Sequence, residues 1–285
     1  MKAGYEKHQT DLSVILDTGK FNCVSSATLY NIVGLRLGLD VRAIEVPDHA
    51  FSIQYVGTKH ADVETTNAAG FNPARDPRIL DPVEQLIGPD ILCWNTLFWI
   101  KESRSKSFVS WHQDTRYWGL SSEKVFSVWL ALSPASEESG CMRVMPGTHR
   151  GDVLPHDDRY HEDNMLTRGQ AITRGVDETK AVLMPLEPGQ ISIHNYRIAH
   201  ASGPNNADDR RIGVSMHFMP PDTEQIVGNW DSAALVRGED RQGNFEATPI
   251  PEKDFDPKAV AFQQKAARAM SKVLYAGAER NTAKL

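Results

Sequence analysis

Two histidines and one aspartate have the types and spacing of a metal site. His112 and Asp114 stand two residues apart in the segment Trp111-His112-Gln113-Asp114. On an extended strand, residues i and i+2 face the same side, so one strand end could present an imidazole and a carboxylate to a single metal ion. The candidate for a third ligand is His200. Two histidines and a carboxylate leave three metal positions open, which is the arrangement of non-haem Fe(II) oxygenases.

The spacing between His200 and Arg211, eleven residues (211 − 200), strengthens this interpretation. Taken alone, a His-x-Asp pair in a chain with 10 histidines is also explained by a strand-end histidine bonded to its neighbouring aspartate. Arg211 opens a predicted strand on which Arg211, Gly213 and Ser215 share one face. A buried arginine is costly unless it meets a carboxylate, which its planar fork binds through two hydrogen bonds. With Gly213 leaving room, Arg211 predicts a dicarboxylate that spans from iron to the guanidinium.

Two other histidines could compete for the metal. His194 precedes His200 by six residues, also at a predicted strand end, and is interpreted as pocket-lining. His217 has the same strand parity as Arg211, so it either faces the lumen or is a hydrogen-bonded core histidine, which we favour. Neither has the eleven-residue spacing to an arginine.

Strand and turn patterns also separate the remaining candidates. Arg210 could replace Arg211, but strand alternation would turn it away from the lumen. His149 follows the turn sequence Pro146-Gly147-Thr148 and is interpreted as structural.

The elements that must position these residues are mostly short strands. The pattern predicts strands near residues 91–101, 108–112, 125–132, 141–145, 190–194 and 211–219. Many short strands separated by turn signals are typical of a β-sandwich or barrel. Helices are predicted at Asp81–Ile87 and Asp256–Ala278, and the polar stretch Asp152–Lys180 is expected to cross the barrel mouth.

The first seventy residues have a different character. Helical spacing covers Cys23–Leu37, and short strands are predicted at residues 41–46, 50–56 and 61–65. A loop-like stretch rich in Gly and Pro follows at residues 67–77. We therefore predict a small α+β unit at residues 1–72 and a mainly β domain at residues 73–285.

Residues from about 78 to 250 resemble the phytanoyl-CoA dioxygenase family of Fe(II)/2-oxoglutarate oxygenases. The resemblance rests on six ordered motifs: Ser110-Trp-His-Gln-Asp114, Val128-Trp-Leu-Ala131, Ser139-Gly-Cys-Met-Arg-Val-Met-Pro-Gly-Thr-His149, Glu187-Pro-Gly189, His200-Ala-Ser-Gly-Pro-Asn205 and Arg210-Arg-Ile-Gly213. It implies a double-stranded β-helix, or jelly roll, with flanking helices. The implied cofactors are Fe(II), 2-oxoglutarate as cosubstrate and O2.

The resemblance also implies a role for each matching residue. The iron ligands would be His112, Asp114 and His200, and Arg211 would bind the distal carboxylate of 2-oxoglutarate. Ser202 is expected to assist Arg211. Two further residues match positions near the cosubstrate, Gln113 and Trp129.

The implied reaction is a dioxygenase reaction that hydroxylates or otherwise oxidises a small organic substrate and releases succinate and CO2. Related iron halogenases lack the carboxylate ligand, so Asp114 favours hydroxylation over chlorination. Substrate contacts are expected from Tyr117, Trp118 and the stretch Asp152–Lys180, although Trp118 is equally explained by core packing. A β-barrel that keeps these motifs without turnover is a further alternative.

Three residues of the N-terminal unit suggest a second chemistry. Cys23 lies at a predicted helix start, where a thiol pKa falls, and His49 and Asp62 lie on or beside successive predicted strands. This order resembles the core of the transglutaminase-like superfamily. It implies a thiol hydrolase or acyl-transferase with Cys23 as nucleophile, His49 as base and Asp62 as the orienting group. A plain buried cysteine is the alternative.

Composition excludes several classes of partner. The net charge of −6 argues against nucleic-acid binding, and no apolar run is long enough to span a membrane. The N-terminus lacks the apolar segment of a signal peptide, and the three cysteines are far apart, so we expect a reducing cytoplasm. A small-molecule substrate is therefore the expected partner. A homo-oligomer is a further possibility, because an open sheet edge would favour self-association.

Overall fold

The computed structural model describes residues 27, 31, 40–46, 49–56, 59–63, 73–251 and 256–279, and for residues 40–63 it describes the backbone. The chain divides into two units, Met1–Pro73 and Ala74–Leu285. Each unit is described separately.

The first unit contains a three-stranded antiparallel sheet in the order β1-β2-β3. Its strands are β1 (Asp40–Val46), β2 (His49–Val56) and β3 (Lys59–Val63), close to the predicted ranges. Ala27 and Asn31 are helical, and the Asn31 amide donates to the Ala27 carbonyl at 2.7 Å. The rest of the predicted helix Cys23–Leu37 lies outside the described residues.

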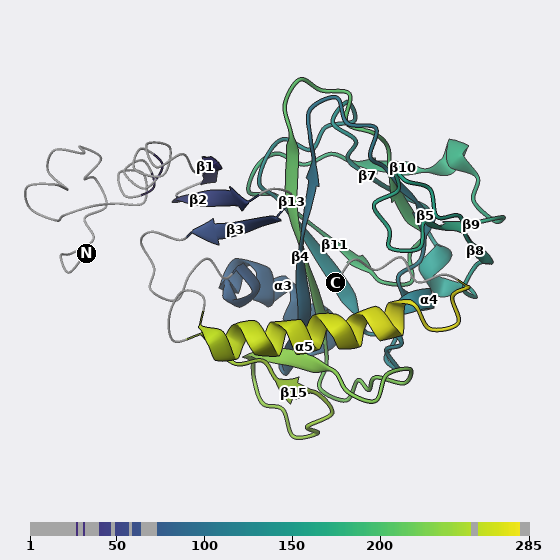
Figure 1. Cartoon of the computed structure of the whole chain (residues 1–285). Helices are drawn as coiled ribbons and strands as arrows, with labels where there is room; N and C mark the ends of the chain where they lie inside the picture. The colour runs from purple at the N-terminus through teal and green to yellow at the C-terminus, as the bar shows by residue number, and fades with distance from the viewer. Residues whose placement is uncertain are drawn as a thin grey trace, which may run out of the picture. The chain divides into compact units, whose positions relative to one another are not determined.

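The second unit is a jelly roll built from two main sheets (Figure 1). The six-stranded sheet has the order β11 (Ile191–Asn195), β6 (Phe126–Ala131), β13 (Arg211–Met219), β4 (Ile91–Lys101), β14 (Ser232–Arg237) and β15 (Glu246–Ala247). The four-stranded sheet has the order β10 (Val182–Met184), β7 (Met142–Val144), β12 (His200–Ser202) and β5 (Val109–His112). Paired strands run antiparallel, apart from β14 and β15. The predicted mainly β fold is therefore confirmed.

Strand β13 is the centre of the larger sheet, because β6 and β4 pair with it on either side. All nine of its residues are buried, as expected for a strand covered on both faces. One apolar cluster of the core joins β4 to neighbouring elements through Leu92, Trp94, Tyr196 and Met219, with Met270 packed against it.

Four strands of three residues have no signal in the sequence, and one of them is β12, which carries His200. The polar stretch Asp152–Lys180 contains two others, β8 (His156–Asp158) and β9 (Gln170–Ile172), which pair with each other. Strands this short show no alternation, because three residues are too few to establish a period.

Helix α3 (Pro77–Ile87) begins four residues before its predicted start. Asp76 caps it by accepting from the Arg78 amide, and Pro82 is accommodated inside the helix. Residues 73–251 and 256–279 also contain the α-helices α4 (Thr115–Trp118) and α5 (Pro257–Leu274) and the 3-10 helices η1 (Pro73–Arg75), η2 (Thr148–Arg150) and η3 (Glu178–Lys180). None of the described helices combines the length and the apolar character needed to cross a bilayer.

Candidate active site

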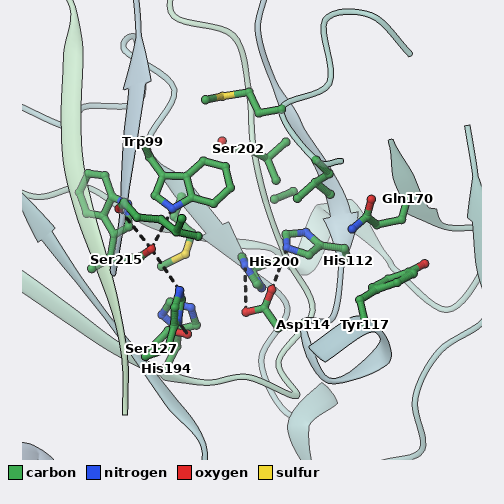
Figure 2. A pocket seen from close by; sticks show the side chains of 18 of the residues that line it. Trp99, His112, Asp114, Tyr117, Ser127, Gln170, His194, His200, Ser202 and Ser215 are labelled. Atoms are coloured by element: carbon green, nitrogen blue, oxygen red, sulfur yellow. Dashed lines mark hydrogen bonds and ion pairs between the residues drawn. The ribbon is translucent and has the colours of Figure 1, made fainter. Parts of the chain in front are cut away.

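A cavity of about 160 Å³ lies between the two main sheets of the jelly roll. Both sheets contribute to its walls: β4, β6, β11 and β13 on one side, β5, β7 and β12 on the other. In Figure 2, His112, Asp114 and His200 form its centre, with Trp99 and Ser215 to one side and Tyr117 and Gln170 to the other. The cavity therefore contains the residues whose spacing predicted a metal site.

The ligand triad, defined as His112, Asp114 and His200, is assembled by strand pairing and a turn. His112 is the last residue of β5 and lies directly opposite His200 of β12. Asp114 is not on an extended strand as predicted, because the chain turns into α4 there, with a helical backbone (φ −58, ψ −38). Asp114 Oδ1 lies 3.3 Å from His112 Nε2, and Oδ2 lies 4.0 Å from His200 Nε2. One ligand atom from each residue lies within 4.8 Å of the others.

Backbone carbonyls fix the orientation of both imidazoles. His112 Nδ1 lies 2.9 Å from the Ser110 carbonyl, and His200 Nδ1 lies 3.1 Å from the Ile198 carbonyl. Each Nδ1 is therefore the protonated nitrogen, and each Nε2 lone pair points toward the centre of the triad. Two lone pairs and a carboxylate then face one another without a proton between them. A cation is the group that would relieve this arrangement.

Electrostatics in the triad favour the protonation states that bind metal. Burial, reinforced by His112, lowers the pKa of His200 to about 4, which keeps its imidazole neutral near pH 7. Burial would raise the pKa of Asp114, but His200 and His112 outweigh it and lower this pKa to about 2. A neutral imidazole and an ionised carboxylate are the forms that coordinate a divalent ion.

Arg211 is a buried cation at the far end of the same cavity. It is 2% exposed, and burial lowers the pKa of its guanidinium to about 10, so it stays charged near pH 7. One guanidinium nitrogen donates to the Gly140 carbonyl at 2.9 Å, while Nε has no hydrogen-bond partner among the described residues. The guanidinium carbon lies 5.2 Å from the centre of the Trp129 ring. Arg211, Trp129 and Ser202 line the cavity together and are called the carboxylate site below.

A second buried cation, Lys101, stands beside Arg211 and was not singled out from the sequence. Lys101 is the cross-strand partner of Arg211 and is 0% exposed. Its Nζ donates to Ser202 Oγ at 2.6 Å and to the Gly203 carbonyl. Ser202, expected to assist Arg211, is thus held by Lys101. Alternation along the predicted strand could have found this lysine, since Leu97 and Trp99 have its parity and line the cavity.

Comparison with known proteins identifies the family. The family model for phytanoyl-CoA dioxygenase (PhyH) matches residues 44–213, more than half of the chain. The chain belongs to the phytanoyl-CoA dioxygenase family. The match begins well before residue 78, where the motifs placed the start of the resemblance, so PhyH similarity reaches into the first unit.

Individual relatives agree with this assignment. Human peroxisomal phytanoyl-CoA dioxygenase is 32% identical over 155 residues, covering 53% of this chain and 46% of that protein. A probable alpha-ketoglutarate-dependent hypophosphite dioxygenase of Stutzerimonas stutzeri is 28% identical over 159 residues, covering 54% of each. The chain thus spans about half the length of the curated relatives it matches. The structure of the non-heme monooxygenase ThoJ superposes with a TM-score of 0.63 at 36% identity, covering 71% of this chain and 74% of that one.

The reason for a glycine at position 213 of this PhyH chain differs from the one predicted. The space beside it is filled by the Trp129 indole and is not left for a ligand: a Cβ at residue 213 would lie 1.9 Å from Trp129 Cζ2. Gly213 thus makes room for the Trp129 ring, which lies beside the Arg211 guanidinium. Its effect on a ligand bound in the cavity would be indirect, through the position of Trp129.

Substituting Gly213 by alanine should therefore destabilise the fold and disturb the carboxylate site. Because the added methyl group would overlap a rigid ring, the expected cost is about 1–3 kcal/mol of unfolding free energy. Chemical denaturation would measure this cost, and quenching or shift of tryptophan fluorescence would report movement of the indole. Alanine at Gly151, whose Cβ would meet nothing within 4 Å, is the control. Equal stability of the two variants would contradict the packing explanation.

Gln113 does not reach the cavity, contrary to the expectation that it lies near the cosubstrate. Its side chain donates to the Arg197 carbonyl at 2.6 Å and accepts from the Leu154 amide at 2.7 Å. Gln113 thus ties the ligand-bearing turn to the two loops that contain Leu154 and Arg197. Trp129 lines the cavity as expected.

The other histidines lie close to the places predicted for them. His194 lines the cavity with its ring centre 5.1 Å from that of His200, but it is not part of the ligand triad. His217 combines both interpretations: it lines the cavity and is hydrogen-bonded to Ser127 Oγ at 2.8 Å and Ser215 Oγ at 3.2 Å.

Arg210 and His149, which were predicted to lie outside the lumen, do not line the cavity. Arg210 points away and pairs with Glu102 at 2.9 Å. His149 lies in η2 and is not among the cavity-lining residues.

The stretch that was expected to cross the mouth lines part of the cavity, together with the end of α5. Met165, Leu166 and Gln170 from the stretch and Leu274 from α5 line the cavity. Arg168 joins the two parts, because it donates to the carbonyls of Leu274 and Ala276 and pairs with Asp158. The sequence predicted the helix but gave no sign that its last turn would border the site.

Tyr117 and Trp118 of α4 also line the cavity. Burial raises the pKa of Tyr117 to about 12, so its hydroxyl remains a neutral donor. Trp118 fits both of its interpretations, since it also packs against Trp94 with ring centres 5.1 Å apart.

The second predicted constellation belongs to the first unit, and its arrangement stays a prediction. Cys23 lies outside the described residues. His49 is the first residue of β2, whereas Asp62 of β3 pairs with Ile53, four positions further along β2. Four residues correspond to about 13 Å of strand. The backbone register therefore separates the positions of His49 and Asp62 by four residues along the sheet.

Proposed function

We propose that this chain is an Fe(II)- and 2-oxoglutarate-dependent dioxygenase that oxidises a small organic molecule and forms succinate and CO2. The observation that carries the proposal is the cavity that joins a ligand triad to a buried arginine without a carboxylate partner among the described residues. Two imidazoles and one carboxylate fit Fe(II), which accepts nitrogen and oxygen ligands and needs open positions for its co-reactants.

In this proposal, His112, Asp114 and His200 hold the metal, and the carboxylate site holds the far end of 2-oxoglutarate. Bound iron would supply the activation of O2 that the side chains themselves cannot perform. Arg211 has a charged fork whose Nε lacks a partner among the described residues, which suits a carboxylate. Asp114 occupies the position that chloride takes in related halogenases, so hydroxylation is the proposed outcome.

The remaining walls orient the substrate and exclude water. Tyr117, Met165, Leu166 and Leu274 line the cavity and offer apolar surface with few polar groups. Both charged residues of the lining other than histidine, Asp114 and Arg211, already have roles in metal and cosubstrate binding. Relatives named for a CoA thioester and for hypophosphite act on different substrates, so neither is transferred to this chain.

Anaerobic addition of Fe(II) and 2-oxoglutarate should produce the weak visible charge-transfer band of an iron-bound 2-oxo acid. The proposal expects the band because the triad leaves positions for a chelating ligand. Succinate release on admission of O2, measured with candidate substrates, then reports turnover. Absence of the band at saturating Fe(II) would overturn the proposal. A band without succinate release from any substrate would favour the non-catalytic alternative.

No observation favours thiol chemistry at Cys23, His49 and Asp62, and the transglutaminase-like resemblance stays a prediction. A reducing cytoplasm remains part of the proposal, supported by the two described cysteines, Cys93 and Cys141, which are buried thiols. A small molecule is the proposed partner, and self-association stays a prediction.

A further inference from the structure

Two buried basic side chains, with no counter-ion among the described residues, lie side by side at the carboxylate site. Lys101 and Arg211 are direct partners across β4 and β13, and both side chains are buried. Neither forms an ion pair with a carboxylate in the part of the chain that the structure describes. Burying two like charges together is unfavourable in a protein interior. The protein therefore has to discharge one of them or supply an anion.

The hydrogen bonds of Lys101 match a neutral amine. Its Nζ has two recorded acceptors, Ser202 Oγ and the Gly203 carbonyl, and a neutral amine has two N–H groups to donate. An ammonium has a third N–H, for which no acceptor is recorded among the described residues. A carboxylate bound next to Arg211 would offset the added charge of the ammonium through space.

Ser202 connects Lys101 to the cavity. Lys101 donates to Ser202 Oγ, so this oxygen acts as acceptor there and its own hydrogen is left to donate elsewhere. Ser202 lines the cavity with Arg211, whereas Lys101 lies behind it. An anion bound at Arg211 would therefore accept from the Ser202 hydroxyl, and Lys101 would orient that hydroxyl.

We propose that Lys101 is a proton-linked positioning residue of the carboxylate site, which takes up one proton from solvent when a carboxylate binds at Arg211 and which aims the Ser202 hydroxyl at that carboxylate. The inference rests on the proposed function, since it takes 2-oxoglutarate as the anion. No bond other than N–H is made, and the proton comes from the buffer.

The charged and titratable groups that face Lys101 set the pH range of this linkage. Burial and then Arg211 lower the pKa of Lys101 to about 7 in the empty protein, and a bound carboxylate would raise it. Cys141 also acts on Lys101, but burial raises its thiol pKa, so it carries no charge near pH 7. Glu102, the residue that follows the end of β4, is exposed and pairs with Arg210.

These pKa values determine how the affinity for 2-oxoglutarate changes with pH. Below about pH 7, Lys101 is already protonated in the empty protein, so 2-oxoglutarate binding is accompanied by little proton uptake. Above it, binding must bring a proton, so 2-oxoglutarate affinity falls as pH rises, with a limit of about tenfold per unit for one proton. Arg211 stays charged throughout this range because its pKa is about 10.

The test is calorimetric titration of the anaerobic Fe(II) protein with 2-oxoglutarate in buffers of different ionisation enthalpy. At about pH 8 the expected uptake is close to one proton, falling toward zero at about pH 6. 2-Oxopentanoate, which has a methyl group where 2-oxoglutarate has its distal carboxylate, should bind without this uptake. Equal proton uptake by the two ligands would overturn the inference, because the proton would then belong to the metal end.

Two variants separate linkage from a structural role. Lys101→Met removes the charge at similar volume and should weaken 2-oxoglutarate about tenfold or more at about pH 7, flatten the pH dependence and raise the Tm of the empty protein. Lys106→Met, at an exposed lysine nearby, should change none of these. Ser202→Ala should weaken binding, and adding Lys101→Met to it should cost less than the sum of the single changes.

The outcomes distinguish the inference from the proposed function. If 2-oxoglutarate fails to bind at any pH and no charge-transfer band forms, the proposed function falls. If it binds with the band but without proton uptake, or if Lys101→Met keeps the wild-type pH profile, the function stands and the role of Lys101 is refuted.

Discussion

Replacing Asp114 by alanine should remove iron binding while the jelly roll stays folded. Changes behind a metal ligand already cost about 10- to 100-fold in metal affinity, so loss of a ligand should cost more than about 100-fold. Asp114 bridges the space between His112 and His200, and no other described carboxylate joins the triad. Metal content after anaerobic loading and the visible band with 2-oxoglutarate are the measurements.

The control for this variant is Asp157→Ala, which removes an exposed carboxylate of β8 outside the cavity lining. It should bind iron as the wild type does. Because Asp114→Ala removes a buried charge that faces two lone pairs, its metal-free form should melt no earlier than the wild type. Retained stoichiometric Fe(II) in Asp114→Ala would contradict the assignment of the triad.

Replacing Arg211 by methionine should lower the affinity for 2-oxoglutarate more than any other substitution at the carboxylate site. Truncating one partner of a buried charge pair costs about 2–5 kcal/mol, which is at least roughly 30-fold in affinity. Iron binding should be unaffected, since Arg211 is not among the triad. The metal-free protein should become more stable, because a buried guanidinium without a carboxylate partner is replaced by apolar atoms.

Arg210→Met is the matched control for Arg211→Met, one residue earlier on the chain and facing the other way. Its loss removes a surface pair with Glu102, which is worth about 0–1 kcal/mol of stability. Titration of the anaerobic iron form with 2-oxoglutarate compares the two variants. If both variants bind 2-oxoglutarate equally well, Arg211 does not hold its distal carboxylate.

The sequence by itself determined the chemical types at the site and the faces they occupy. A His-x-Asp pair, a distant histidine and an arginine eleven residues later predicted the cavity, and parity placed Arg211 inward and Arg210 outward. These predictions succeeded because side-chain direction along a strand has a period of two residues, which local sequence records. The mainly β class followed from the same periodicity.

Only the tertiary structure decided which side chains meet. His112 faces His200 because β5 pairs with a three-residue strand that has no pattern of its own, Trp129 fills the space beside Gly213, and Leu274 of α5 borders the cavity. Lys101 reaches Ser202, 101 residues away, because the end of β4 lies beside the loop after β12. Such contacts depend on the pairing of distant segments, and local periodicity holds no record of which segments will be neighbours. The residues of the ligand triad could therefore be predicted from residue spacing, whereas the contact between Lys101 and Ser202 required the fold.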